Sequence, residues 1–162
     1  MSLFDINWSA ELGILVSVAV AMVLGGAVGY ERQLRGRPAG FRTHMLVAGA
    51  AALLLGMTDL IAEHFNQEMY APRVQIDPVR VIEAMVTAIA FIGAGTIIQH
   101  ARRDVVLGLT TAASLLFTVS IGIAVGLGHL VLATGVTVLA VLTLRVLTGP
   151  KPEDPGPAQR ED

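Results

Sequence analysis

The densest group of side chains that could do chemistry lies in residues 30–44, which read YERQLRGRPAGFRTH. Glu31 is expected at the carboxyl-terminal end of a helix, where its negative charge meets the negative end of the helix dipole. A guanidinium group close by would offset that cost. We therefore expect an ion pair between Glu31 and Arg37, Arg42 or another basic residue near them.

The remaining polar residues of this segment have simpler interpretations. A solvated basic loop fully explains Arg35 and is one interpretation of Arg32. His44 begins an apolar stretch and is expected at the interface with water, although its imidazole could also sense pH or pair with Glu31. With a second acid and two hydroxyls added, the candidate functional polar residues are Glu31, Arg32, Arg37, Arg42, Thr43, His44, Glu83, Thr110 and Thr111.

Four acids elsewhere in the chain could form a second site. Glu83 reaches furthest into an apolar stretch, where an ionisable group needs a partner or a polar cavity, and Arg80 three residues earlier offers the partner. Asp59 and Glu63, four residues apart, share a helix face, and an oxygen-rich cluster of all four acids would suit magnesium. The four are Asp59, Glu63, Asp77 and Glu83. Solvation at a membrane surface is the favoured interpretation, so no metal ion is assigned to them.

Composition and motifs argue against several classes of function. The net charge is −2, from 11 basic and 13 acidic residues, so the chain lacks the basic excess that grips nucleic acid. It has no cysteine, which removes thiol catalysis and thiolate metal sites. The metalloprotease, hydrolase, P-loop and dinucleotide-binding motifs are absent from the sequence. We therefore expect a protein that is not an enzyme and carries no cofactor.

The elements that must position these residues are apolar blocks. The chain is 54% hydrophobic and only 15% charged, and its hydrophobic residues gather into blocks of about 20, the length that crosses a bilayer core of ~30 Å. All seven prolines lie outside the blocks. This pattern predicts an all-α membrane bundle of five transmembrane helices in a domain of residues 1–148. The predicted spans are residues 12–30, 45–63, 80–99, 105–126 and 129–147.

The basic residues predict the orientation of these spans. Arginine and lysine concentrate in alternate connections, and such residues are retained on the cytoplasmic side of a membrane. The N-terminus is therefore expected outside and the C-terminus inside. Residues 149–162, with four prolines and no large apolar side chain, are expected to form a flexible cytoplasmic tail.

Glycines in the blocks predict close contacts between helices, because apolar surface alone gives helices little reason to associate in lipid. Two GxxxG pairs occur, at residues 25–29 and 122–126. Internal packing is the favoured interpretation, ahead of a dimer interface. The predicted packing residues are Gly25, Gly26, Gly29, Gly93, Gly95, Gly122 and Gly126.

Four strings together resemble the MgtC/SapB family of bacterial inner-membrane proteins. They are GGAVGYER at 25–32, RPAGFRTHMLV at 37–47, FIGAG at 91–95 and GLTTAAS at 108–114. The resemblance implies a five-span membrane domain and a role in growth at low magnesium and in survival inside host cells. It also implies action on other membrane proteins, with the ATP synthase and magnesium transporters as proposed partners.

The sequence departs from the family pattern in places. Longer members carry a cytoplasmic domain after the fifth span, so this chain resembles a short form. Ala84, Ala88, Ala90 and Leu116 stand where the family commonly has glutamine, glycine, glycine and an aromatic residue.

The sequence therefore predicts a multi-pass protein of the bacterial inner membrane that modulates another membrane complex in magnesium or proton homeostasis, and that could form a homodimer. The alternative is a channel or carrier for a divalent cation or protons, with Glu83, Asp59 and Glu31 lining its path.

Overall fold

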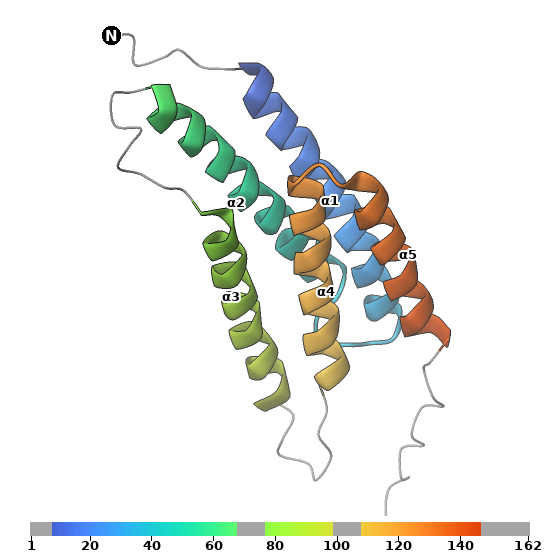
Figure 1. Cartoon of the computed structure of the whole chain (residues 1–162). Coiled ribbons are helices and arrows are strands. Elements are labelled where there is room, and N and C mark those ends of the chain that lie inside the picture. Colours follow the sequence, from blue (N-terminus) through green and yellow to red (C-terminus); the bar gives the residue numbers. More distant parts are fainter. Residues whose placement is uncertain (1–7, 68–76, 99–107, 147–162) are drawn as a thin grey trace, which may run out of the picture.

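The computed structural model describes residues 8–67, 77–98 and 108–146, and these residues form an all-helical bundle (Figure 1). Its helices are α1 (Trp8–Leu34), α2 (Phe41–Gln67), α3 (Pro78–Ile98), α4 (Leu109–Gly126) and α5 (Leu130–Val146). The first four are long and apolar enough to cross a membrane, and α5 is an apolar helix of 17 residues, at the short end of the range for a span. The predicted fold class, a membrane helical bundle, is confirmed.

Two helix boundaries differ from the predicted spans in a way that matters for the polar residues. Helix α1 continues to Leu34 and α2 begins at Phe41, so Glu31 and His44 lie inside helices instead of at their edges. Both helices continue into the polar segment, and a tight turn joins them. In this turn, Gly36 has a φ of 63°, which glycine adopts without strain. Residues 149–162 and the start of the predicted fourth span, 105–107, lie outside the described residues.

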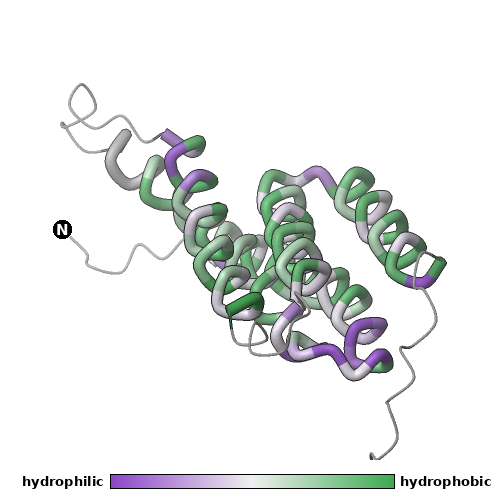
Figure 2. The backbone as a smooth tube through the Cα atoms, turned by 90° about the horizontal axis from the view of Figure 1, so that it is seen from below, coloured by the Kyte–Doolittle hydropathy of each residue, from purple (hydrophilic) through white to green (hydrophobic). Residues whose placement is uncertain are grey.

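The polar residues gather at the ends of the bundle, as the hydropathy colouring shows (Figure 2). The end of α1, the start of α2, the start of α4 and the end of α5 lie together (Figure 1). We call this the basic end, because Arg32, Arg35, Arg37, Arg42 and Arg145 lie there. The opposite end holds the short turn between α4 and α5. The orientation of the two ends across a membrane stays a prediction.

The centre of the bundle is a close-packed contact of α1, α2 and α4. A Cβ atom added to Gly25 of α1 would lie 2.6 Å from Cβ of Ala48 on α2. One added to Gly122 of α4 would overlap the carbonyl oxygen of Ala48 and lie 2.8 Å from Cβ of Ala51. Both GxxxG segments therefore serve packing within the chain, because glycine lets the backbones approach this closely.

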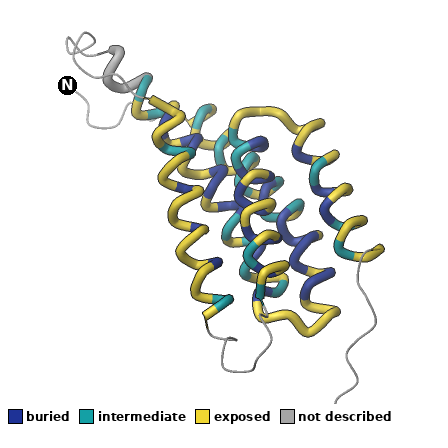
Figure 3. Tube along the Cα trace, turned by 60° about the horizontal axis from the view of Figure 1, so that its bottom comes forward, coloured by how far each residue is buried: buried dark blue, intermediate teal, exposed yellow. Residues whose placement is uncertain are grey.

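Of the other predicted packing glycines, four lie in contacts between helices and one does not. Gly26, Gly29, Gly93 and Gly126 each lie against a neighbouring helix, where a Cβ would be within 3.1 Å of another atom. Gly95 does not, since a Cβ there would meet nothing within 4 Å. The prediction for Gly95 was wrong, because it lies on an exposed side of α3. Buried residues concentrate on the inward sides of α1, α2 and α4, and α3 is mostly exposed (Figure 3).

Candidate functional site

A buried polar network lies at the basic end, where α1, α2 and α4 meet. It brings together two segments that the sequence singled out, residues 31–44 and residues 108–114. Glu31, Arg32, His44 and Thr111 are each at most 4% exposed, and Ser114 is 5% exposed. Their burial shows that these residues do not form a solvated loop.

Arg32 connects α1 to α4. Its Nη2 atom donates a hydrogen bond of 2.7 Å to Oγ1 of Thr111, 79 residues later in the chain. Its Nε atom has no hydrogen-bond partner among the described residues. The interpretation of Arg32 as a solvated loop residue was wrong, because α1 runs one turn further than predicted and carries this side chain into the contact with α4.

His44 connects α2 to the same helix. Its Nδ1 atom lies 2.9 Å from the carbonyl oxygen of Gly40, which can only accept, so Nδ1 carries a proton and donates. Its Nε2 atom lies 3.2 Å from Oγ of Ser114, and that hydroxyl also lies 2.8 Å from the carbonyl oxygen of Thr111. His44 is fully buried, so the expected position at a water interface was wrong.

This geometry gives the imidazole two ways to satisfy its hydrogen bonds. With Nε2 unprotonated, the Ser114 hydroxyl donates to the ring. With Nε2 protonated, the ring donates to Ser114 Oγ and the hydroxyl donates to the carbonyl oxygen of Thr111. Both arrangements satisfy the two ring nitrogens, so the contact between α2 and α4 does not depend on which one is adopted.

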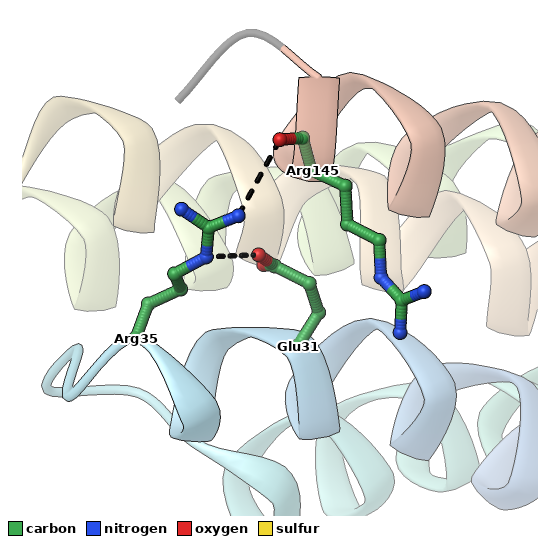
Figure 4. A network of polar contacts seen from close by, with 3 residues as sticks. All are labelled: Glu31, Arg35 and Arg145. Carbon is green, nitrogen blue, oxygen red and sulfur yellow. Dashed lines mark hydrogen bonds and ion pairs between the residues drawn. The ribbon is translucent and has the colours of Figure 1, made fainter. Parts of the chain in front are cut away.

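Glu31 forms the expected ion pair, and its partner is Arg35. Nε of Arg35 lies 3.1 Å from Oε1 of Glu31, a contact close enough for an ion pair but not aligned as a hydrogen bond. Nη2 of Arg35 also donates to the carbonyl oxygen of Arg145 near the end of α5, at 3.4 Å (Figure 4). Arg35 thus joins α1 to one of the unpaired carbonyls at a helix end, and it is not simply solvated.

Four other predicted residues lie at the same end, whereas Glu83 lies near the start of α3 at the opposite end. Arg37, Arg42 and Thr110 are exposed, and Thr43 is half-buried. The structure adds Arg35, Arg145 and Ser114, which the sequence reasoning did not place in the site. Thr111, Ser114 and Thr118 recur at helical spacing, and that pattern could have indicated a shared face of α4 directed at His44.

Within the described residues, the structure does not bring the candidate acids together. Asp59, Asp77 and Glu83 are exposed, and the side chain of Glu63 lies outside the described residues. Asp77 immediately precedes α3, and its Oδ1 accepts from the backbone N–H of Val79 at 3.0 Å. Arg80 pairs with Asp77 at 3.9 Å, so the expected pairing with Glu83 was wrong. Within the described ranges, no group of three or more His, Asp or Glu could hold a metal ion. The unassigned alternative, a metal cluster of all four acids, is therefore not supported by the three whose side chains are described.

Apolar residues fill the space between the polar network and the opposite end. Val28, Leu115, Ile121 and Val125 are at most 1% exposed, and small residues such as Ala48 and Ala52 close the gaps between them. Thr118 is buried there too, but its hydroxyl donates to the carbonyl oxygen of Ser114 within its own helix. In the described part of the chain, no continuous row of polar groups joins Glu83 to Glu31.

The apolar helices and the buried network at one end define a multi-pass α-helical membrane protein. The chain belongs to the MgtC family, whose model matches residues 18–150. A relative in Escherichia coli named "Putative magnesium transporter YhiD" is 35% identical over 133 residues, covering 82% of this chain and 59% of that protein.

Two further relatives show the same pattern of coverage. Protein MgtC of Brucella abortus is 35% identical over 140 residues, covering 85% of this chain and 53% of the relative. Protein SapB of Bacillus subtilis is 31% identical over 123 residues, covering 76% and 51%. This chain thus spans a little over half of the length of these relatives. No solved structure matches it.

Proposed function

We propose that this protein is a non-enzymatic regulator in the bacterial inner membrane, which modulates another membrane complex in magnesium or proton homeostasis. Membership of the MgtC family and the names of its relatives support a magnesium-related membrane protein. An ATP synthase or an ion transporter is the kind of complex on which it would act. A homodimer is compatible with this role.

The close-packed interior is the observation that carries the proposal. A protein that moves ions needs polar groups or water along its path, because an ion in a dry apolar region has no ligands. Here glycine contacts bring α1, α2 and α4 together, and fully buried apolar residues such as Leu115 and Ile121 occupy the space between them. That interior suits a rigid body that acts through its surface.

The basic end offers the surface for such a contact. Arg37 and Arg42 are exposed on either side of the turn between α1 and α2, next to the buried network. Their guanidinium groups could pair with acidic residues of another membrane protein without disturbing the helices that hold them. The buried network would keep this turn in one conformation.

Co-purification from native membranes tests the proposal. We expect the double variant Arg37→Ala/Arg42→Ala to fold normally but to lose most of the recovered partner complex, at low magnesium above all. Glu11→Ala is the control, since it removes an exposed charge in the first turn of α1, at the opposite end. Recovery of no partner by the wild-type protein, at low or high magnesium, would contradict the proposal.

Transport of a divalent cation or protons is the second candidate, and two observations favour it. One is the name of the Escherichia coli relative. The other is a cavity of about 270 Å³ at the opposite end, lined by Ser17 of α1, Asp59 of α2 and mostly small apolar residues, which could admit water. Reconstituted liposomes distinguish the two functions. Transport predicts flux that Asp59→Asn or Glu83→Ala abolishes, and regulation predicts no flux above that of empty vesicles.

A further inference from the structure

Helices α2 and α3 enclose a groove on the side of the bundle away from α5. Its volume is about 570 Å³, within the range of about 300–1,000 Å³ that is typical of ligand sites. Its walls are almost wholly apolar, and Val119 of α4 lies among them. On the α3 side, Ala84 and Ala88 keep the groove open, because their side chains are short.

The length of the groove matches one leaflet of a bilayer. On α3 it extends from Arg80 to Ile92, a separation of twelve positions that spans about 18 Å along a helix. Half of a ~30 Å hydrocarbon layer is about 15 Å. The groove therefore begins at the level of lipid headgroups and ends near the middle of the membrane.

The cross-section of the groove favours a thin occupant. A volume of about 570 Å³ spread over about 18 Å leaves roughly 30 Å², much less than the section of a helix about 10–12 Å wide. A hydrocarbon chain fits this space, whereas a helix from another protein or a second copy of this chain would reach only its rim.

Charged groups stand at the headgroup end of the groove. The Arg80 side chain is 85% exposed, and its guanidinium lies 3.9 Å from the Asp77 carboxylate, which is 49% exposed. Guanidinium groups match phosphate oxygens well. The carboxylate beside it suits an ammonium group, so the pair complements a headgroup that carries both charges.

From this geometry we propose that the groove binds a phospholipid of the leaflet at the opposite end, with one acyl chain between α2 and α3. Its phosphate contacts Arg80 and its ammonium group contacts Asp77. The expected lipid class is therefore that of phosphatidylethanolamine. The predicted orientation of the spans makes this the outer leaflet.

Native mass spectrometry of the full-length protein in detergent, with added lipids of identical acyl chains, tests the proposal. We expect phosphatidylethanolamine to be retained in preference to phosphatidylglycerol, which lacks the ammonium group, and to diacylglycerol, which lacks the phosphate. Equal retention of phosphatidylethanolamine and either of the other two would overturn it.

Two variants test whether Arg80 and Asp77 bind the headgroup. Arg80→Gln should lower phosphatidylethanolamine retention about five-fold, the effect of one basic residue at a membrane surface. Asp77→Asn keeps a helix-capping side chain and should remove the preference over phosphatidylglycerol. Unchanged retention in either variant would overturn the assignment, and neither exposed substitution is expected to unfold the protein.

Filling the groove provides an independent test. Ala88→Leu should lower retention about ten-fold, because the added carbons occupy the space of the acyl chain. Ala90→Leu is the matched control, an exposed alanine on the same helix that does not line the groove. Because the chain has no cysteine, Ala88→Cys also tests whether a second copy of the chain occupies the groove. A disulfide-linked dimer through this position would show a second copy there and contradict the proposal.

Discussion

Helices α4 and α3 are neighbours of similar hydropathy, but the bundle uses them differently. Half of the apolar stretch of α4 is buried within the described structure, against 17% of that of α3. Helix α4 contacts all four other helices, whereas α3 contacts α4 and, slightly, α2. The central helix positions the polar network, and the peripheral helix leaves its surface for lipid or another protein.

Small and hydroxyl-bearing residues account for this difference better than hydropathy does. On α4, Thr111 bonds to Arg32, Ser114 contacts His44, and Gly122 lets α2 approach. On α3, Gly93 makes such a contact, with Ala112 of α4. Large apolar residues of α3, such as Phe91, remain exposed. In lipid, close approach and polar contacts decide which helices form the centre.

Leucine substitutions should show the largest difference between α4 and α3 in their effect on stability. Gly122→Leu places a side chain against the backbone of Ala48, so we expect the free energy of unfolding to fall by about 3 kcal/mol. Gly95→Leu on α3 enters open space and should change it by less than about 0.5 kcal/mol. Denaturation of the purified proteins in detergent measures both, and equal losses would refute the distinction.

Arg32 provides the next largest effect. Arg32→Met keeps the aliphatic length but removes the bond from the guanidinium to Thr111, and the free energy of unfolding should fall by about 2 kcal/mol. Arg37→Met, an exposed neighbour in the same segment, should change it by less than about 0.5 kcal/mol. The same denaturation assay applies, and a tolerated Arg32→Met would show that Arg32 does not hold α4 to α1.

Two serines of α4 give the comparison with the smallest expected effect on stability, and it tests a single contact. Ser114→Ala removes the hydroxyl from His44 and should cost about 1 kcal/mol. Ser120→Ala removes only an exposed hydroxyl that bonds to its own helix at Leu116, so its effect should be smaller. The ¹⁵N chemical shift of the His44 ring should change in the first variant alone. A shift that responds equally to both would exclude the contact with Ser114.

The sequence predicted the fold well because its information lies in blocks of hydrophobic residues. The helices and most packing glycines follow from block length and from the GxxxG spacing. The ends of α1 and α2 were less predictable, since polar residues such as Glu31 and His44 are typical of a loop when read locally. Only tertiary contacts with α4 reveal that they are buried.

The sequence predicted most of the residues of the site but not the contacts between them. The need of Glu31 for an arginine followed from helix electrostatics, but the choice of Arg35 depends on the turn that α1 completes before Gly36. The contacts of Arg32 with Thr111 and of His44 with Ser114 join residues at least 70 positions apart. No local pattern specifies such pairings.

The close-packed interior is the central claim, and labelling of single cysteines tests it most directly, because the chain has none of its own. Ile121→Cys places a thiol in the fully buried contact of α4, and Ser17→Cys places one in the cavity at the opposite end. A charged, membrane-impermeant thiol reagent should label the cysteine at position 17 and leave that at position 121 unlabelled. Labelling of both at similar rates would show water in the interior and contradict the account.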